Sequence, residues 1–174
     1  MGDWVGGRPA ENRAEAGFTL IELMVVVLII GILIGTALPI YLGARARAQN
    51  RAAMSDLRNG VAAAKTVYTD SLTYTGITIA AMSAVEPALT FVAAGTPSSA
   101  ANNYGLSFRV FNYGEVNMAR LSESGECFYI RTIEQQGPAP SDVPGVYMGH
   151  RNGIACTDNQ IAGYGTFPAN FMGW

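Results

Sequence analysis

The longest unbroken apolar run lies near the N-terminus, at residues 18–38, and reads FTLIELMVVVLIIGILIGTAL. Glu22 is its only strongly polar side chain. As an α-helix, a run of this length would be about 31 Å long, which matches the hydrocarbon core of a bilayer. No polar position recurs every 3.6 residues, so the helix would be apolar on all faces. The pattern predicts a helix that lies in lipid or at the centre of an assembly.

A cleaved secretory signal is the alternative interpretation of this run. Such a signal has a basic start, an apolar centre of about 7–15 residues and a small-x-small cleavage site. The triplets Ala44-Arg45-Ala46 and Ala46-Arg47-Ala48 would fit that site. Because the apolar run is longer and the helical pattern continues past both triplets, the sequence favours a membrane span.

Beyond Pro39 the helical pattern continues with a different character. Residues 40–72 are rich in Ala, with Arg and Asp interspersed, and an apolar side chain recurs every three or four positions. This spacing predicts an amphipathic helix that packs its apolar side on the rest of the chain. One helix is therefore expected from near Phe18 to about Leu72, with Pro39 inside it. The apolar stripe consists of Met54, Leu57, Val61, Ala64, Tyr68 and Leu72.

Short elements separated by turn residues are expected after the long helix. Residues 73–104 are rich in Thr, Ala, Ser and Gly, which predicts loops with one short helix at 80–85. Short links between the strand patterns that follow indicate an antiparallel sheet. Residues 135–174 are expected to be irregular. The fold class is α+β, with the second half of the long helix packed on a small antiparallel sheet. The predicted strands are residues 106–112, 116–122 and 127–134.

Composition narrows the possible functions. The chain has 174 residues, of which 49% are hydrophobic and 14% charged, and this balance excludes a disordered chain. Binding of nucleic acid through many phosphate contacts requires an excess of basic side chains. The net charge of −2 argues against such a function. A zinc site needs four nitrogen or sulfur ligands, and the chain has only two Cys and one His to supply them. No metal or cofactor is therefore expected. No acid–base pair, nucleophile elbow or phosphate loop accompanies the loop residue His150, so we expect a protein that is not an enzyme.

Cys127 and Cys156 are the only cysteines of the chain. If the region after the membrane span lies outside the cytoplasm, the two cysteines predict one disulfide, and two free buried thiols are the alternative. A loop of about 30 residues closed in this way would gain roughly 3.5 kcal/mol of stability in the chain-entropy model.

The segment AGFTLIELMVVVLIIGILIGTALPIYL resembles the N-terminus of type IV prepilins. The resemblance implies that a prepilin peptidase cleaves after Gly17 and that Phe18 becomes the N-methylated first residue. It also implies that Glu22 pairs with the Phe18 amine of a neighbouring subunit during assembly. The alternative is that Glu22 pairs with no neighbouring subunit and its carboxylate only extends to the lipid headgroups. Pro39 would lie where filaments of this family have a kinked or locally melted first helix, and Cys127 and Cys156 would bound the disulfide region.

The resemblance also implies a pilin fold in four segments. These are a leader at 1–17, a membrane and filament-core part at 18–38, an amphipathic part of the helix at 39–72, and a globular head at 73–174. The chain would be a single-pass protein of the cytoplasmic membrane before assembly. It would then become a homo-oligomeric surface filament that serves adhesion or motility, with the pilus assembly platform as a further partner.

Two other functions in the same superfamily stay open. One is a pseudopilin of a type II secretion system. Many major pseudopilins carry a C-terminal calcium site built from clustered acids, whereas Asp142 and Asp158 are the only acids after Glu134 here, which argues mildly against this function. The other is a minor pilin that acts in DNA uptake or adhesion. The basic residues that such a module would use are expected to be largely buried by subunit packing and to form salt bridges between subunits. They are Arg45, Arg47, Arg51 and Arg58.

Overall fold

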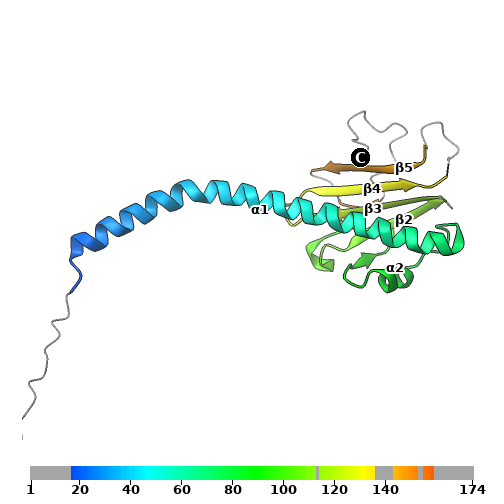
Figure 1. Ribbon diagram of the computed structural model, residues 1–174, viewed down its shortest axis with the longest axis horizontal. Helices are drawn as coiled ribbons and strands as arrows, with labels where there is room; N and C mark the ends of the chain where they lie inside the picture. The colour runs from blue at the N-terminus through cyan, green and yellow to red at the C-terminus, as the bar shows by residue number, and fades with distance from the viewer. Residues whose placement is uncertain (1–16, 113, 136–142, 153–154, 159–174) are drawn as a thin grey trace, which may run out of the picture. The chain divides into compact units, whose positions relative to one another are not determined.

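The computed structural model in Figure 1 describes residues 17–112, 114–135, 143–152 and 155–158. The chain divides into two compact units, Met1–Leu42 and Gly43–Trp174. One helix, α1 (Leu20–Ser71), contributes to both units. The predicted long helix is confirmed, and Pro39 lies inside it without ending it. The predicted leader, except for Gly17, lies outside the described residues.

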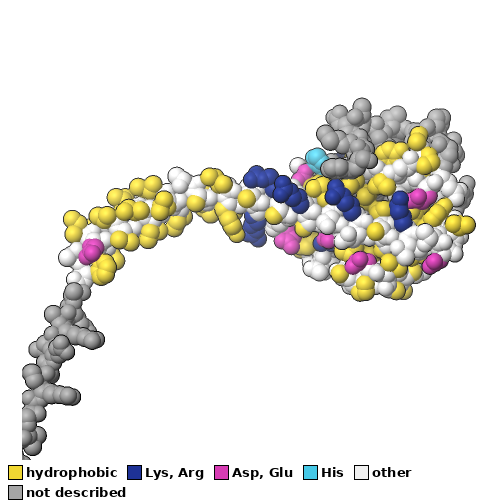
Figure 2. Space-filling model, viewed as in Figure 1, with side chains coloured by type: hydrophobic (Ala, Val, Ile, Leu, Met, Phe, Trp, Pro, Cys, Tyr) yellow, Lys and Arg dark blue, Asp and Glu magenta, His cyan; other side chains and the backbone are white. Residues whose placement is uncertain are grey.

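In the first unit, α1 carries a continuous apolar surface that no described residue of this unit covers. Eighteen large hydrophobic side chains from Phe18 to Leu42 are exposed. Figure 2 shows these side chains on all visible sides of the helix. Among the described residues, α1 is the one helix that is long and apolar enough to cross a membrane. Its N-terminal part therefore requires lipid or a partner.

The second unit is built on a five-stranded sheet with the strand order β1-β2-β3-β4-β5. β1 pairs with β2 in parallel, and all other neighbours are antiparallel. The short helix α2 (Ile79–Val85) and the 3-10 turn η1 (Ala100–Asn102) lie in the connection between α1 and β2. The strands are β1 (Phe91–Val92), β2 (Leu106–Asn112), β3 (Glu115–Leu121), β4 (Cys127–Ile133) and β5 (Gly145–Arg151).

The three predicted strands and the short helix are confirmed, whereas two strands were missed. β1 has two residues, too few to show an alternating pattern. β5 was assigned to an irregular tail, and that prediction is wrong for Gly145–Arg151. Its sequence GVYMGHR contains two glycines, which weaken the local strand signal. Seven register pairs with β4 stabilise it instead, from Cys127↔Arg151 to Ile133↔Gly145.

Figure 1 shows the second half of α1 lying across one face of the sheet. The apolar stripe of this half packs on that face. Leu57, Val61 and Ala64 are buried there, together with Gly60. A Cβ at Gly60 would lie 2.6 Å from Cδ2 of Leu106, so glycine permits the close approach of helix and sheet. The sheet side of this core is formed by Leu106, Phe108, Val116, Met118, Phe128 and Ile130.

The predicted stripe is wrong at its last member. Leu72 is 70% exposed, and its φ of 55° lies in the left-handed region. The helix therefore ends at Ser71, and the chain turns away before Leu72 can reach the core.

Candidate functional site

The start of α1 places the predicted processing residues together at one helix end. Gly17, Phe18 and Thr19 precede the first helical residue, and the Phe18 side chain is 76% exposed. Thr19 caps the helix because its Oγ1 accepts a hydrogen bond from the backbone N–H of Glu22 at 3.3 Å. The bond between Gly17 and Phe18 lies in non-helical backbone just before this cap.

Glu22 occupies the first turn of α1, where its charge meets the positive end of the helix dipole. The Thr19 hydroxyl donates to Glu22 Oε2 at 3.4 Å, and no other described side chain contacts this carboxylate. Cleavage after Gly17 would create an ammonium group four residues before Glu22. The helix end can therefore hold one anion and one cation close together in an otherwise apolar segment.

The other predicted site residues are not brought to this helix end. Pro39 lies about five turns farther along α1 and is exposed. Cys127 and Cys156 belong to the second unit, where they form the predicted disulfide, with a Cα–Cα distance of 5.4 Å. Both cysteines are buried, so the bridge is a structural element of the head.

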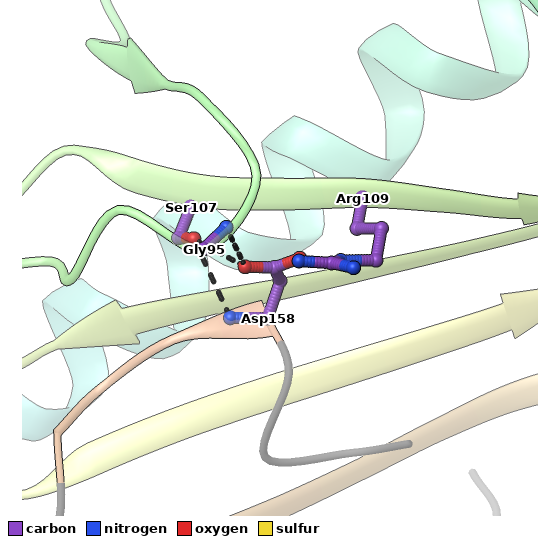
Figure 3. Close-up of polar contacts among 4 residues, drawn as sticks. All are labelled: Gly95, Ser107, Arg109 and Asp158. Atoms are coloured by element: carbon purple, nitrogen blue, oxygen red, sulfur yellow. Dashed lines mark hydrogen bonds and ion pairs between the residues drawn. The ribbon is translucent and has the colours of Figure 1, made fainter.

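Next to the disulfide, Asp158 fastens the C-terminal segment to the sheet through contacts that the sequence analysis missed. Its side chain is fully buried. Oδ1 accepts hydrogen bonds from the Gly95 N–H at 2.6 Å and from the Ser107 hydroxyl at 2.8 Å. Oδ2 lies 2.6 Å from Nε of Arg109. Figure 3 shows Gly95, Ser107 and Arg109 converging on the Asp158 carboxylate. The one signal in the sequence is that this aspartate follows Cys156 by two positions.

Polar contacts fasten α1 to the β3–β4 turn at the beginning of the head. Gln49 donates to Glu123 at 3.0 Å, and Asn50 donates to Glu126 at 2.6 Å. The Ser124 hydroxyl donates to Asn50 Oδ1 at 2.5 Å. These contacts fix the position of the helix where it meets the sheet.

A second polar cluster holds the other end of α1. Glu134 accepts from Lys65 at 2.9 Å and from the buried Tyr74 hydroxyl at 3.0 Å. Burial alone would raise the pKa of Glu134, but the hydrogen bonds from Lys65 and Tyr74 outweigh it and lower the pKa. Burial raises the pKa of Tyr74, and the Glu134 charge adds to that effect. Glu134 is therefore a charged acceptor that joins helix and sheet.

The remaining candidates of the sequence analysis lie at the surface of the single chain. Arg45, Arg47, Arg51 and Arg58 are exposed on α1. Nε2 of His150 lies 3.3 Å from Oε1 of Glu126, and the side chain is 65% exposed. No group of three or more potential metal ligands occurs among the described residues. Asp142 lies outside them.

Residues 12–38 match the family described as the prokaryotic N-terminal methylation motif. The match includes Gly17, Phe18, Glu22 and the apolar run. No curated protein and no solved structure matches the chain. The long N-terminal helix followed by a mostly antiparallel sheet is an α+β arrangement consistent with a pilin fold.

Proposed function

We propose that this chain, a type IV prepilin-like protein by its N-terminal methylation motif, is a structural subunit of a type IV pilus. The observation that carries the proposal is the exposed apolar surface of α1 that starts directly after the predicted cleavage site. The proposed segments are a leader at 1–17, a filament-core part at 18–38, an amphipathic part at 39–72 and a head at 73–174.

The apolar surface is too large for a soluble monomer. Full burial of one large hydrophobic side chain stabilises by roughly 1.5–3 kcal/mol relative to leaving it exposed. Eighteen such side chains between Phe18 and Leu42 therefore represent tens of kcal/mol, above the whole stability of a typical domain at about 5–15 kcal/mol. The helix is accordingly a membrane span before assembly and a filament core afterwards. A head-to-tail contact of this kind, which does not close into a ring, generates a filament.

Processing would switch the chain between these two states. Prepilin peptidase removes the leader after Gly17 and methylates the new amine of Phe18. That amine supplies the cation that Glu22 needs, since an unpaired carboxylate within a membrane helix is costly. A pair formed between Phe18 of one subunit and Glu22 of the next would also fix the axial offset between neighbours.

Substitution of Glu22 tests this function. Glu22→Ala should leave the chain in the membrane and processed, but abolish or sharply reduce filaments sheared from the cell surface. Asp70→Ala, which removes an exposed acid near the other end of α1, is the matched control and should assemble normally. Wild-type amounts of filament from Glu22→Ala would contradict the proposed pairing.

Pilus assembly is favoured over a pseudopilin role by the tail acid Asp158. Both of its carboxylate oxygens are engaged by donors of the protein, so this residue serves the fold instead of a calcium ion. An adhesion or DNA-uptake role would be an addition to the filament subunit. In this proposal the chain is a substrate of prepilin peptidase and is not itself an enzyme.

A further inference from the structure

Three arginines follow the apolar part of α1 within nine residues, and the proposed pairing of Phe18 with Glu22 does not involve them. The salt bridges between subunits that the sequence predicts for them would form only in the filament, so in the unassembled subunit these arginines stay available. We call Arg45, Arg47 and Arg51 the arginine collar. All three are exposed, and no described acid lies within ion-pair distance of them. Figure 2 shows Lys and Arg side chains gathered on the helix directly after its apolar side chains.

The neighbouring acids form no ion pair with the collar. Glu123 and Glu126 lie near this part of α1, where they accept hydrogen bonds from Gln49 and Asn50 instead of from the arginines. The first acid on the helix after the collar, Asp56, is paired with Arg120 at 2.8 Å. Three positive charges therefore remain available to an external anion.

The depth of the collar fits the headgroup layer of a bilayer. The apolar helix from Leu20 to Leu42 is about 33 Å long, close to the hydrocarbon thickness of about 30 Å. Arg45 then lies about 4–5 Å beyond Leu42 along the helix axis, and Arg51 about 13 Å beyond it. The headgroup layers add about 5–8 Å on each side, so Arg45 lies within this layer. The backbone of Arg51 lies beyond it, and its side chain reaches back because an arginine on a helix leans toward the N-terminus.

The geometry of Arg47 supports this placement. Its Nη1 lies 3.4 Å from the point that a Cβ of Gly43 would occupy, so the guanidinium extends back over the preceding turn toward the apolar segment. Arg45 lies about 160° around the helix from Arg47, and Arg51 follows Arg47 by about one turn on the same side. The collar thus presents guanidinium groups on both sides of the helix.

We propose that the arginine collar binds the phosphates of anionic phospholipids and sets the depth of the unassembled subunit in the membrane. The proposal rests on the proposed function, in which the leader faces the cytoplasm. Arg45, Arg47 and Arg51 then lie on the outer side, where the positive-inside rule does not favour them, so topology does not explain their presence. Guanidinium groups match phosphate oxygens in a bidentate geometry, and a basic residue near an anionic surface gains about fivefold in binding.

Native mass spectrometry of the full-length chain tests the collar. The chain is released from mild detergent that contains equimolar dioleoylphosphatidylglycerol and dioleoylphosphatidylcholine, and the bound lipids are counted. The wild type should retain phosphatidylglycerol preferentially. Each Arg→Gln change in the collar should lower that preference about fivefold. The control Arg58→Gln removes the same charge about one further heptad along α1 and should leave the preference unchanged.

Three results would overturn the proposal. One is an unchanged lipid preference in the triple variant R45Q/R47Q/R51Q. Another is an equal loss in Arg58→Gln, which would indicate a bulk charge effect. The third is competition by millimolar glycerol phosphate in water, which would indicate a site for free anions. If the triple variant keeps its lipid preference but forms no filaments, the arginines act between subunits, and the filament function itself still stands.

Discussion

The ion pair between the buried Asp158 and the partly exposed Arg109 gives the sharpest prediction for the head. Asp158 is completely buried, whereas the side chain of Arg109 is 34% exposed. Arg109→Gln leaves a buried carboxylate with two neutral donors, the Gly95 N–H and the Ser107 hydroxyl. Asp158→Asn instead leaves a guanidinium that can turn toward water. Removal of the arginine should therefore cost more stability than removal of the aspartate charge.

The magnitudes follow from the burial of the two groups. Breaking a buried ion pair costs about 3–5 kcal/mol, and a hydrogen bond to a charged group is worth about 1.5–3 kcal/mol. We expect Arg109→Gln to lower the free energy of unfolding by about 3–4 kcal/mol and Asp158→Asn to lower it by about 2–3 kcal/mol. The second loss is smaller because the partly exposed arginine can be solvated when its partner is removed. The double variant should be less destabilised than the sum of the two, because neither charge is then left unpaired.

Urea unfolding of the full chain in mild detergent, followed by near-ultraviolet circular dichroism, measures these differences under non-reducing conditions. Arg45→Gln, which alters an exposed arginine of α1, serves as the control and should change stability by less than about 0.5 kcal/mol. A larger loss of stability in Asp158→Asn than in Arg109→Gln would contradict this role of the pair. Simply additive effects of the two substitutions would contradict it as well.

Three further predictions concern the head. Reduction of the Cys127–Cys156 bridge, which spans 29 positions, should lower the free energy of unfolding by about 3.5 kcal/mol, measured by urea unfolding with and without reductant; an unchanged midpoint would be inconsistent with its role. Gly60→Leu should destabilise by more than about 2 kcal/mol in the same assay, since even a Cβ would collide with the sheet. Because the pKa of Glu134 is lowered in the folded chain, its pairing with Lys65 stabilises the head above the unfolded-state pKa of about 4.3 and is lost as pH falls further. Glu134→Gln should therefore remove part of the stability difference between pH 7 and pH 3, and an unaltered pH profile would contradict this.

Elements with a long or regular pattern were predictable from the sequence. The course of α1 followed from an all-apolar run joined to an amphipathic stripe, and both signals survive Pro39. β2, β3 and β4 followed from short strand patterns separated by turn residues. In these segments the local preference and the tertiary fold agree.

Elements that depend on distant partners were not predictable. β5 carries two glycines and forms because β4 offers a complete row of hydrogen-bonding partners. Asp158 shows its role only when Gly95, Ser107 and Arg109 converge on it, and these residues lie 49 or more positions away. Leu72 kept the helical spacing, but the left-handed backbone at that residue ended the helix first.

At the N-terminus, the motif around Gly17, Phe18 and Glu22 could be identified without coordinates. The structure adds the Thr19 cap, which fixes the start of α1 after the predicted cleavage site and keeps Glu22 in the first turn. The proposed pairing of Glu22 with Phe18 joins two subunits, so it was expected from the resemblance and not from contacts within one chain.

We propose that removal of the leader releases α1 for assembly. The N-terminal peptide of assembled subunits shows whether this cleavage has taken place. Filaments sheared from the cell surface should be purified and analysed by tandem mass spectrometry. We expect all filament subunits to share one N-terminus, an N-methylated Phe18 followed by Thr19. Filaments whose subunits begin at Met1, or processed chains that stay monomeric while the assembly platform is present, would contradict it.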